Sequence, residues 1–440
     1  MAEIRKLEKY RPISEVFNLF YQEEDTVILE SSLTNSLGKY SIIGRRPYHK
    51  IEKFSQSIRI NGQNEDMDFK HYVKSYFRKH YERNTTSLPL TSGAIGYFSY
   101  DYNRRKKGEI PECVLIFYDQ FIIEEHESKK LYLVCNEKTQ TMEAALAELH
   151  DLWDKVEEKV CFGKKIRRVD KYFDFTRSDY EQSIQKIIDY IIEGDIYIAN
   201  MTQRLYIESS MKPYQLYSIL RETNPSPFGA YMNYGGFQIV CASPERFLQI
   251  QDRTIVTRPI KGTRKRGNDP KEDIAMKEEL KHSEKDKSEL LMIVDLERND
   301  LNKVCEPGSV QVKNLFSIES YATVHHLVAE VYGRVREGMD ITDYIDAAFP
   351  GGSITGAPKR RAMEVIEELE KTDRGLYTGT IGYFSLDGDC DLNIVIRTAV
   401  FQEGVYTLGV GGGITCESDT AMEYEETLQK AKAFLDAFKC

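Results

Sequence analysis

The sequence has 440 residues, of which 41% are hydrophobic and 11% aromatic, so the chain can bury one large core or two joined cores. Its 70 acidic and 60 basic residues give a formal net charge of −10 at pH 7, and we therefore expect no nucleic-acid partner. The first residues lack the apolar core of a signal peptide and no apolar run reaches membrane-spanning length, which predicts a cytoplasmic protein with no membrane partner.

The first part of the chain predicts strands interrupted by helices. Apolar and alternating runs predict strands at 26–32, 39–44, 57–62 and 131–137, and a period of 3.6 residues predicts helices at 71–82 and 141–160. A charged stretch, GKKIRRVDKYFDF, follows the second helix. We expect a domain boundary there, between an N-terminal domain of residues 1–165 and a second domain of residues 172–437.

The second part opens with a helix whose start and end are marked. Ser178 and Glu181 have capping-box spacing, and Gly194 is placed to stop the helix. Strands are expected at 195–208 and in four runs between 229 and 259, then helices around 271–301 and 358–370, strands within 377–412 and a terminal helix. Because consecutive strands are joined by short turns, the pattern favours antiparallel sheet and the α+β class.

Two of the expected helices carry acidic pairs. Asp286 and Glu289 are three residues apart, as are Glu423 and Glu426, so each pair shares a helix face. Such pairs taken alone are usually solvated surface. Carboxylates from two helices would also suit Mg²⁺, which prefers oxygen ligands and can bridge to an anionic substrate. Lys430, one turn after Glu426, could then meet a substrate carboxylate.

Glycine-rich segments suggest a second kind of site. In FPGGSITGAPKRRAMEVIEELE the glycines lead into Pro358 at an expected helix start, so the N–H of Gly356 and its neighbours could form an anion cradle, or the segment is simply a tight loop. The run GVGGGI is not G-x-G-x-x-G, and no Walker-type motif occurs. Nucleotide binding therefore has no support.

Some single residues stand out from their surroundings. Arg397 lies in an expected strand of apolar residues and needs an anionic partner, either a protein carboxylate or a ligand, and Tyr377 could offer a hydroxyl nearby. The pair His325-His326 lacks metal-ligand spacing. Lys261, in TRPIKGTRKRG, is either one more surface charge or a nucleophile held against a small anionic substrate.

The segments taken together resemble the chorismate-utilising enzymes. The resemblance is carried, in order over about residues 175–435, by SPERF, TRPIKGTRKRG, ELLMIVDLERNDL, VHHLV, FPGGSITGAPKRRAMEVIEELE, RGLYTGTIGYFS, NIVIRT, GVGGGI and EYEETLQKA. The N-terminal segments VILESSLTNSLGKYSIIG and GAIGYFSYDY, with the later NPSPF, are similar to the family's subunits that work with an amidotransferase. This disfavours the stand-alone isochorismate and salicylate synthases.

The resemblance implies an α+β fold of two interleaved α/β subdomains that form a β-sandwich of antiparallel sheets with helices outside. It assigns Mg²⁺ to Glu289 and Glu426, with Asp286 and Glu423 acting through water, so that the metal holds the ring carboxylate of chorismate. It also implies a chorismate-binding wall made of His326, Ser353, Thr355, Gly356, Tyr377, Arg397, Gly413 and Lys430.

Within the family, the residue before Gly-Thr separates the branches. Anthranilate synthases usually read Pro-Ile-Ala-Gly-Thr, whereas many aminodeoxychorismate synthases read Pro-Ile-Lys-Gly-Thr, as here at Lys261. The resemblance implies that Lys261 adds at C2 of chorismate while Glu245 protonates the leaving C4 hydroxyl. Ammonia then attacks C4 and gives 4-amino-4-deoxychorismate, the precursor of para-aminobenzoate and folate. Ile198 departs from the family, where glutamine is common.

The resemblance also implies partners and leaves alternatives. No Cys-His-Glu amidotransferase set is evident in the sequence, so a separate glutamine amidotransferase subunit should supply the ammonia. The ILESS and NPSPF segments could form a tryptophan pocket. The main alternative is an anthranilate synthase, in which ammonia attacks C2 directly. A regulatory chorismate- or tryptophan-binding protein with a dead site is disfavoured, because acid, nucleophile and metal carboxylates are all present.

Overall fold

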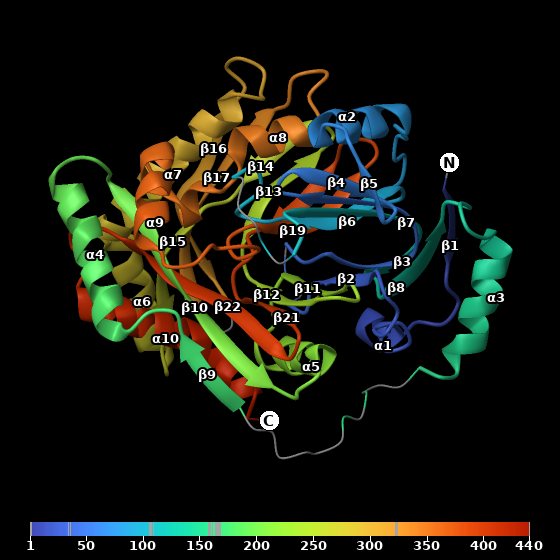
Figure 1. Cartoon of the computed structure of the whole chain (residues 1–440), viewed down its shortest axis with the longest axis horizontal. Coiled ribbons are helices and arrows are strands. Elements are labelled where there is room, and N and C mark those ends of the chain that lie inside the picture. Colours follow the sequence, from blue (N-terminus) through green and yellow to red (C-terminus); the bar gives the residue numbers. More distant parts are fainter. Residues whose placement is uncertain are drawn as a thin grey trace.

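The computed structural model describes residues 2–33, 35, 37–104, 108, 110–156, 160, 162, 169–321 and 324–439. Strands fill the centre of the molecule and helices lie around them (Figure 1). The described strands are β1 (Glu3–Lys6), β2 (Thr26–Glu30), β3 (Tyr40–Phe54), β4 (Ser57–Ile60), β5 (Gln63–Glu65), β6 (Gly93–Phe98), β7 (Cys113–Glu125), β8 (Lys130–Cys135), β9 (Val169–Phe173), β10 (Ile198–Ser209), β11 (Phe228–Asn233), β12 (Gln238–Ser243), β13 (Arg246–Gln251), β14 (Thr254–Thr257), β15 (Ile260–Lys265), β16 (Gln311–Ser320), β17 (Val324–Arg334), β18 (Gly356–Ala357), β19 (Thr380–Ser385), β20 (Cys390–Asn393), β21 (Thr398–Gln402) and β22 (Val405–Ile414).

The described helices are α1 (Ile13–Phe17), α2 (Phe69–Lys79), α3 (Met142–Trp153), α4 (Arg177–Ile192), α5 (Pro213–Thr223), α6 (Pro270–His282), α7 (Glu284–Asn302), α8 (Ile341–Ala348), the 3₁₀ turn η1 (Gly352–Ile354), α9 (Lys359–Leu369) and α10 (Thr420–Ala437). None of them is long and apolar enough to cross a membrane.

Strand pairing joins the two parts of the chain. Every pairing between described strands is antiparallel, which confirms the predicted α+β class with antiparallel sheet. Two N-terminal strands pair directly with strands from the second part, β2 with β11 and β6 with β19. The two parts of the sequence are therefore interleaved. The boundary expected between residues 165 and 172 stays a prediction, and residues 165–168 of that stretch lie outside the described residues.

Two helix starts differ from the sequence expectation. Thr176, and not Ser178, caps α4 by accepting a hydrogen bond from the backbone N–H of Asp179, so the predicted capping box is wrong. The single helix expected around 271–301 is two helices, α6 and α7. Ser283 interrupts them because its extended backbone (ψ 104°) leaves its side chain free to cap α7 at the N–H of Asp286.

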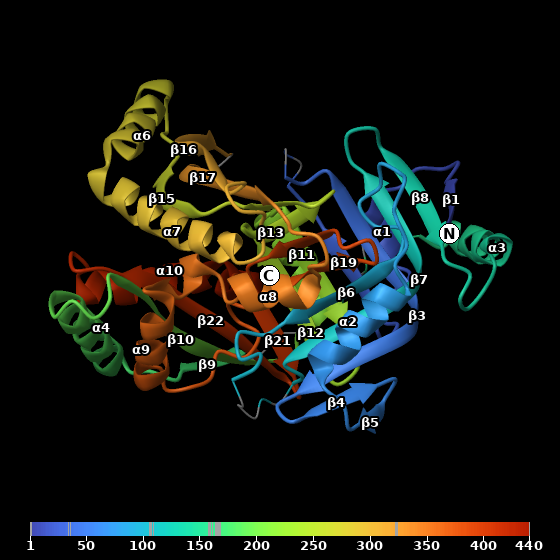
Figure 2. The same ribbon diagram turned by 90° about the horizontal axis from the view of Figure 1, so that it is seen from above.

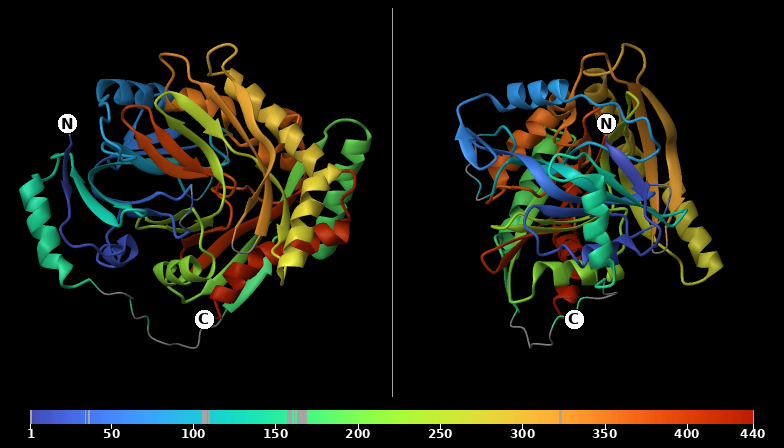
Figure 3. Two further views of the ribbon diagram at one scale, coloured as in Figure 1. Left: turned by 180° about the vertical axis from the view of Figure 1, so that it is seen from behind. Right: turned by 90° about the vertical axis from the view of Figure 1, so that its right-hand side faces the viewer.

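Buried apolar side chains from both parts of the chain share one core. Phe98 and Phe117 of the N-terminal strands belong to the same hydrophobic cluster as Leu290 of α7 and Leu327 of β17. Helix α7 packs on β15 and β17, and α10 packs on β22 (Figure 2). Seen from behind, α6, α7, α10 and α4 lie together on the side away from the N-terminal strands (Figure 3). The inner faces of α7 and α10 are thereby directed toward the strands that carry the candidate site.

Candidate active site

A strip of glycines in β22 forms a floor without side chains. Gly411, Gly412 and Gly413 pair with β10 at the end of β22. A Cβ on Gly412 would lie 3.1 Å from the Oε2 of Glu423 and 3.5 Å from the Oε1 of Glu426. Glycine at these positions therefore leaves room for a ligand between the sheet and the acidic face of α10.

The acidic face of α10 carries its own cation. The Nζ of Lys430 lies 2.6 Å from the Oε1 of Glu426 and donates a hydrogen bond of 2.6 Å to the carbonyl of Gly411. Burial raises the pKa of Glu423, a hydrogen bond from Ser418 opposes that rise, and the nearby charge of Glu426 adds to it. Lys430 thus holds α10 against the glycine floor at the point where an anionic substrate could enter.

Helix α7 faces α10 and contributes the carboxylate of Glu289. Burial raises the pKa of Glu289, the charge of Lys261 opposes this rise, and Asp286 and Glu426 add to it. Asp286 is engaged by Arg264, whose Nη2 lies 3.0 Å from its Oδ2. The structure therefore brings Glu289 within electrostatic reach of α10 and gives Asp286 a cation partner of its own.

The carboxylates fit a divalent cation in their chemistry. Within the described part of the chain, no three acidic, histidine or cysteine side chains are gathered closely enough to hold a metal as they stand. Glu289 and Glu426 nevertheless repel one another across the gap, and Glu423 and Glu426 do so on one helix. A hard cation with oxygen ligands, such as Mg²⁺, would relieve this repulsion. The predicted metal site stays a prediction.

Lys261 and Glu245 meet these groups from the other side. Lys261 lies in β15 opposite Leu327 of β17, and the register shifts between Lys261 and Thr263. The extra residue of this bulge is Gly262, whose φ of 71° lies in the left-handed region, so Lys261 and Thr263 both keep partners on β17. The Nζ of Lys261 lies 3.6 Å from the position that a Cβ on Gly413 would take, so the amine stands above the glycine floor.

The electrostatics of the lysine and the glutamate are coupled. Burial lowers the pKa of the Lys261 amine, which the charges of Glu289 and Glu245 partly offset. Burial raises the pKa of Glu245 to about 7, although the charge of Lys261 and a hydrogen bond from Ser353 oppose the rise. The Oγ of Ser353 donates to the Oε1 of Glu245 at 3.3 Å. Near neutral pH, Glu245 can therefore hold a proton and release it.

The glycine-rich loop 349–357 contributes mainly shape. Thr355 is fully buried (0% exposed), and its hydroxyl donates to the carbonyl of Gly351 at 2.9 Å, so this side chain holds the loop. Gly356 has a φ of +151° and lies so close to β10 that a Cβ would come within 2.1 Å of the carbonyl oxygen of Ile198. Of the three loop residues predicted to bind substrate, Ser353 is the one whose hydroxyl contacts Glu245.

Tyr377 and Arg397 line the site from two irregular segments. The ring of Tyr377 covers Gly409, where a Cβ would lie only 2.2 Å from its Cγ. Arg397 lies before β21 and not within a strand as expected, and its φ of 49° is unusual for a residue with a side chain. It is solvent-exposed, and within the described part of the chain no carboxylate forms an ion pair with it. Burial lowers the pKa of its guanidinium, and the charge of Glu245 opposes this shift.

His326 closes the wall on β17. Its Nδ1 lies 2.9 Å from the Oγ1 of Thr263, on the strand that carries Lys261. Burial, together with the charge of Arg397, lowers the pKa of His326 to about 4, so the ring is neutral at physiological pH. A neutral imidazole can pack against an apolar ring without adding charge to the site.

Two further residues at the site were not predicted from the sequence. Glu297 lies eleven residues after Asp286, three turns along the same face of α7, and this spacing could have identified it. Burial raises its pKa to about 8, and the charge of Glu245 adds to this rise. Arg374 is buried (2% exposed) and donates to Glu370 at 2.7 Å. It also donates to the carbonyls of Ile354 and Asn200, which ties α9 and η1 to β10.

Comparison with known proteins assigns the family. A family model described as chorismate binding enzyme matches residues 28–436. The chain belongs to the chorismate-binding enzymes. It is 38% identical to aminodeoxychorismate synthase component 1 of Bacillus subtilis, over 94% of this chain and 91% of that protein. It is 34% identical to anthranilate synthase component 1 of Acetivibrio thermocellus, over 97% of this chain and 92% of that protein.

Solved structures agree with the family assignment. The crystal structure of anthranilate synthase component I from Streptococcus pneumoniae TIGR4 matches with a TM-score of 0.80 and 29% identity, over 91% of this chain and 93% of that chain. This chorismate-binding enzyme therefore has the fold of its relatives, and it is a chorismate-utilising enzyme.

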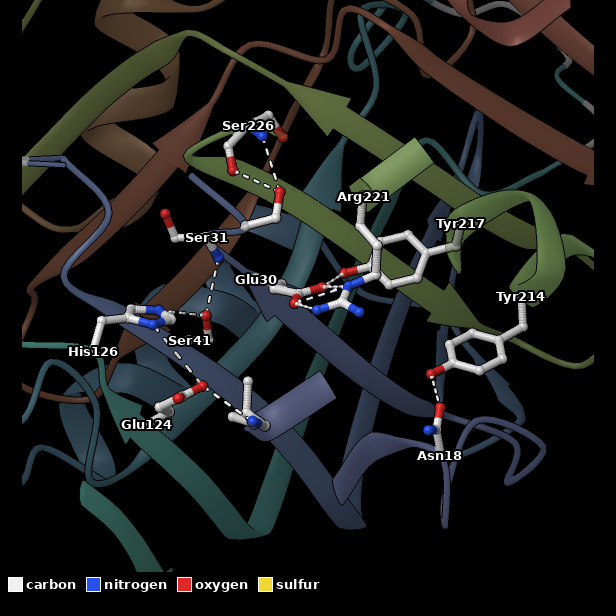
Figure 4. Close-up of polar contacts among 12 residues, drawn as sticks. Asn18, Glu30, Ser31, Ser41, Glu124, His126, Tyr214, Tyr217, Arg221 and Ser226 are labelled. Carbon is white, nitrogen blue, oxygen red and sulfur yellow. Dashed lines mark hydrogen bonds and ion pairs between the residues drawn. The ribbon is translucent and has the colours of Figure 1, made fainter. Parts of the chain in front are cut away.

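A second cavity of this chorismate-binding enzyme lies apart from the catalytic candidates. It has a volume of about 340 Å³, and its wall includes Ser31 and Tyr40 from the N-terminal part and Phe228 from the second part. Glu30 at its edge is paired with Arg221, whose Nη2 lies 2.7 Å from the Oε1 of the glutamate (Figure 4). The ILESS and NPSPF segments are thus brought together, as their resemblance to the paired subunits implies.

Proposed function

We propose that this chain is the large subunit of an aminodeoxychorismate synthase, which converts chorismate and ammonia to 4-amino-4-deoxychorismate for para-aminobenzoate and folate biosynthesis. The observation that carries the proposal is the amine of Lys261, which is enclosed above the glycine floor and coupled to Glu245. The 38% identity to the Bacillus subtilis synthase component supports the same branch.

The chemistry follows from the poor leaving group at C4 of chorismate. Hydroxide leaves slowly, so an acid must protonate it while a nucleophile pushes electrons through the diene. Neutral Lys261 forms a bond to C2, the ring double bonds shift, and the C4–O bond breaks as Glu245 gives up its proton. Ammonia then bonds to C4, the double bonds shift back, and the lysine amine leaves. Glu245 recovers a proton from the attacking nitrogen.

The raised pKa of Glu245 and the lowered pKa of Lys261 suit these roles. A carboxyl with a pKa of about 7 is protonated in a large fraction of molecules at neutral pH and can donate to a hydroxyl. Burial disfavours the charged form of Lys261, so more of the amine is free to attack. The charge of each group stabilises the charged form of the other, so the pair titrates as a unit.

The remaining residues hold the substrate. Glu289 and Glu426, with Asp286 and Glu423 behind them, would hold Mg²⁺, which when bound would neutralise and position the ring carboxylate of chorismate. The guanidinium of Arg397 is exposed, and it can donate two parallel hydrogen bonds to the second carboxylate of chorismate, which belongs to the enolpyruvyl group.

The deciding experiment is product analysis with the lysine removed. We expect the purified chain, given chorismate, Mg²⁺, ammonium and an aminodeoxychorismate lyase, to yield 4-aminobenzoate. Lys261→Ala should reduce this product to background while chorismate still binds. Lys265→Ala is the matched control, because Lys265 is exposed on the same strand. Amination at C4 by Lys261→Ala at the wild-type rate would contradict the nucleophile role, and anthranilate from the wild-type chain would assign it to the other branch.

The ammonia source is part of the proposal. We propose that a separate glutamine amidotransferase subunit delivers ammonia, because the chain carries no evident Cys-His-Glu set. The isolated chain should use ammonium salts at alkaline pH but not glutamine. Efficient use of glutamine by the isolated chain would refute this.

The second cavity is proposed to bind an amino acid such as tryptophan. The cavity has room for an aromatic side chain, and Ser31 and Phe228 line it. Glu30 is already neutralised by Arg221 and accepts a hydrogen bond from Tyr217 at 2.5 Å (Figure 4). We therefore expect weak binding of the ammonium group, which titration calorimetry with tryptophan would measure. Tight binding would require Arg221 to release Glu30.

A further inference from the structure

A short segment of the N-terminal part, residues 99–101, runs beside the segment that carries Tyr377. It follows β6, which pairs with β19, and the last residue of β6, Phe98, lies opposite the first residue of β19. Tyr377 belongs to residues 375–379, which lead into β19. Gly379 shows how closely the two segments approach, because a Cβ there would lie 2.3 Å from the carbonyl oxygen of Phe98.

Gly375 is held by this N-terminal segment at both of its backbone polar groups. Its N–H donates to the Oδ2 of Asp101 at 2.6 Å, and its carbonyl accepts from the N–H of Tyr100 at 2.8 Å. Asp101 is 6% exposed and Tyr100 is 2% exposed, so water competes little for either bond. Gly375 has a φ of 56°, and the two bonds therefore fix the turn that the chain makes there.

The turn at Gly375 determines where Tyr377 lies. The N–H of Tyr377 donates to the carbonyl of Arg374 at 3.1 Å, so Tyr377 is one tight turn away from the point that Asp101 holds. The guanidinium of Arg374 lies 4.6 Å from the ring centroid of Tyr100, which fixes the start of the turn to the same segment. A shift of this turn would move the ring of Tyr377 along the glycine floor.

The carboxylate of Asp101 also acts on a buried cation beneath the turn. The Nη2 of Arg204 lies 3.4 Å from the position that a Cβ on Gly375 would take. Burial lowers the pKa of Arg204, and the charges of Tyr206 and Asp101 are among those that oppose this shift. Asp101 therefore contributes both a hydrogen-bond acceptor and a charge, and a test must separate the two.

We propose that Asp101 is a positioning residue for substrate binding, which through Gly375 sets where the hydroxyl of Tyr377 meets a carboxylate of chorismate. The inference rests on the proposed function in one respect, the contact between Tyr377 and chorismate. Such a bond is sensitive to displacement, because O–H···O hydrogen bonds need a separation of about 2.5–3.0 Å. A side chain of the N-terminal part thus completes a binding site whose other residues come from the second part.

The test compares Asp101→Ala with Asp101→Asn in the full chain. Alanine removes the acceptor for the N–H of Gly375, whereas the amide oxygen of asparagine can still accept this bond without the charge. The values of KM and kcat are measured as consumption of chorismate with Mg²⁺ and ammonium, and a denaturant midpoint measures stability. Asp119→Ala is the matched control, because Asp119 is also buried and accepts from a backbone N–H, that of Lys138, at 2.7 Å.

We expect Asp101→Ala to raise KM for chorismate about tenfold, the effect of losing one hydrogen bond to a charged group, with kcat lowered by less than about threefold. Asp101→Asn should keep KM within about twofold of the wild type. The control should lower the denaturant midpoint without changing KM. If the alanine variant does not fold, Asp101→Glu serves instead, because its longer side chain shifts the acceptor, and it should raise KM by at least about threefold.

A double-mutant cycle separates positioning from general damage. If Asp101 acts through the hydroxyl of Tyr377, Asp101→Ala should change KM by less than about twofold in a Tyr377→Phe background. Fully additive effects on KM, or a wild-type KM in Tyr377→Phe or in folded Asp101→Ala, would overturn the proposal. A wild type that makes anthranilate would instead contradict the proposed function, because KM for chorismate tests Asp101 whichever product forms.

Discussion

Replacing Gly409 with alanine should disturb the site through Tyr377. The added Cβ would lie 2.2 Å from the Cγ and 2.3 Å from the Cδ1 of Tyr377. Carbon atoms in contact are usually about 3.5–4.0 Å apart, so the ring must retreat by more than about 1 Å. Overpacking of this kind costs about 1–3 kcal/mol, and the stiffer unfolded chain offsets about 0.4–1 kcal/mol. The free energy of unfolding should therefore fall by about 0.5–2 kcal/mol.

The same change should weaken substrate binding. If the hydroxyl of Tyr377 bonds a carboxylate of chorismate, its loss costs about 1.5 kcal/mol or more, which raises KM by about tenfold. The assay is a denaturant midpoint together with kcat and KM for chorismate. Gly236→Ala is the control, because nothing lies within 4 Å of its added Cβ, and its stability should change by less than about 0.5 kcal/mol. Equal midpoints and equal KM values for the two variants would refute the reasoning.

The remaining predictions concern charge. Arg374→Ala should lower the free energy of unfolding by about 3–5 kcal/mol in guanidinium denaturation, because it leaves buried Glu370 without its cation, and a loss below about 1 kcal/mol would contradict this. The rate should fall on both sides of a pH optimum, because the reactive form needs a protonated Glu245 and a neutral Lys261 at the same time; a rate that is flat through neutral pH would oppose the acid role. Glu245→Gln should reduce kcat by about 10²–10⁴. Glu426→Gln should weaken the binding of Mg²⁺ and of chorismate together, as measured by calorimetry. If the affinity of the wild type for chorismate is the same with and without Mg²⁺, Glu426 is an ordinary solvated surface residue.

Local patterns in the sequence predicted most of the elements. Alternation of apolar residues predicted β2 and β8, and helical periodicity predicted α2 and α9, because these signals depend only on neighbours a few residues away. The boundaries of the elements depend on more distant contacts. Thr176 and Ser178 are both capping residues, and which of them caps α4 depends on where the chain leaves β9. The break at Ser283 likewise depends on how α6 and α7 pack on β15 and β17.

The α+β class, the acidic faces of α7 and α10 and, through the ordered motifs, the family follow from the amino-acid sequence. Which of these groups meet depends on tertiary packing. Lys261 and Gly413 are far apart in the chain, and tertiary packing places the Nζ of Lys261 3.6 Å from the position that a Cβ on Gly413 would take. The pKa values of Glu245 and Lys261 were also beyond the sequence, because burial is their largest cause and burial exists only once distant segments have packed.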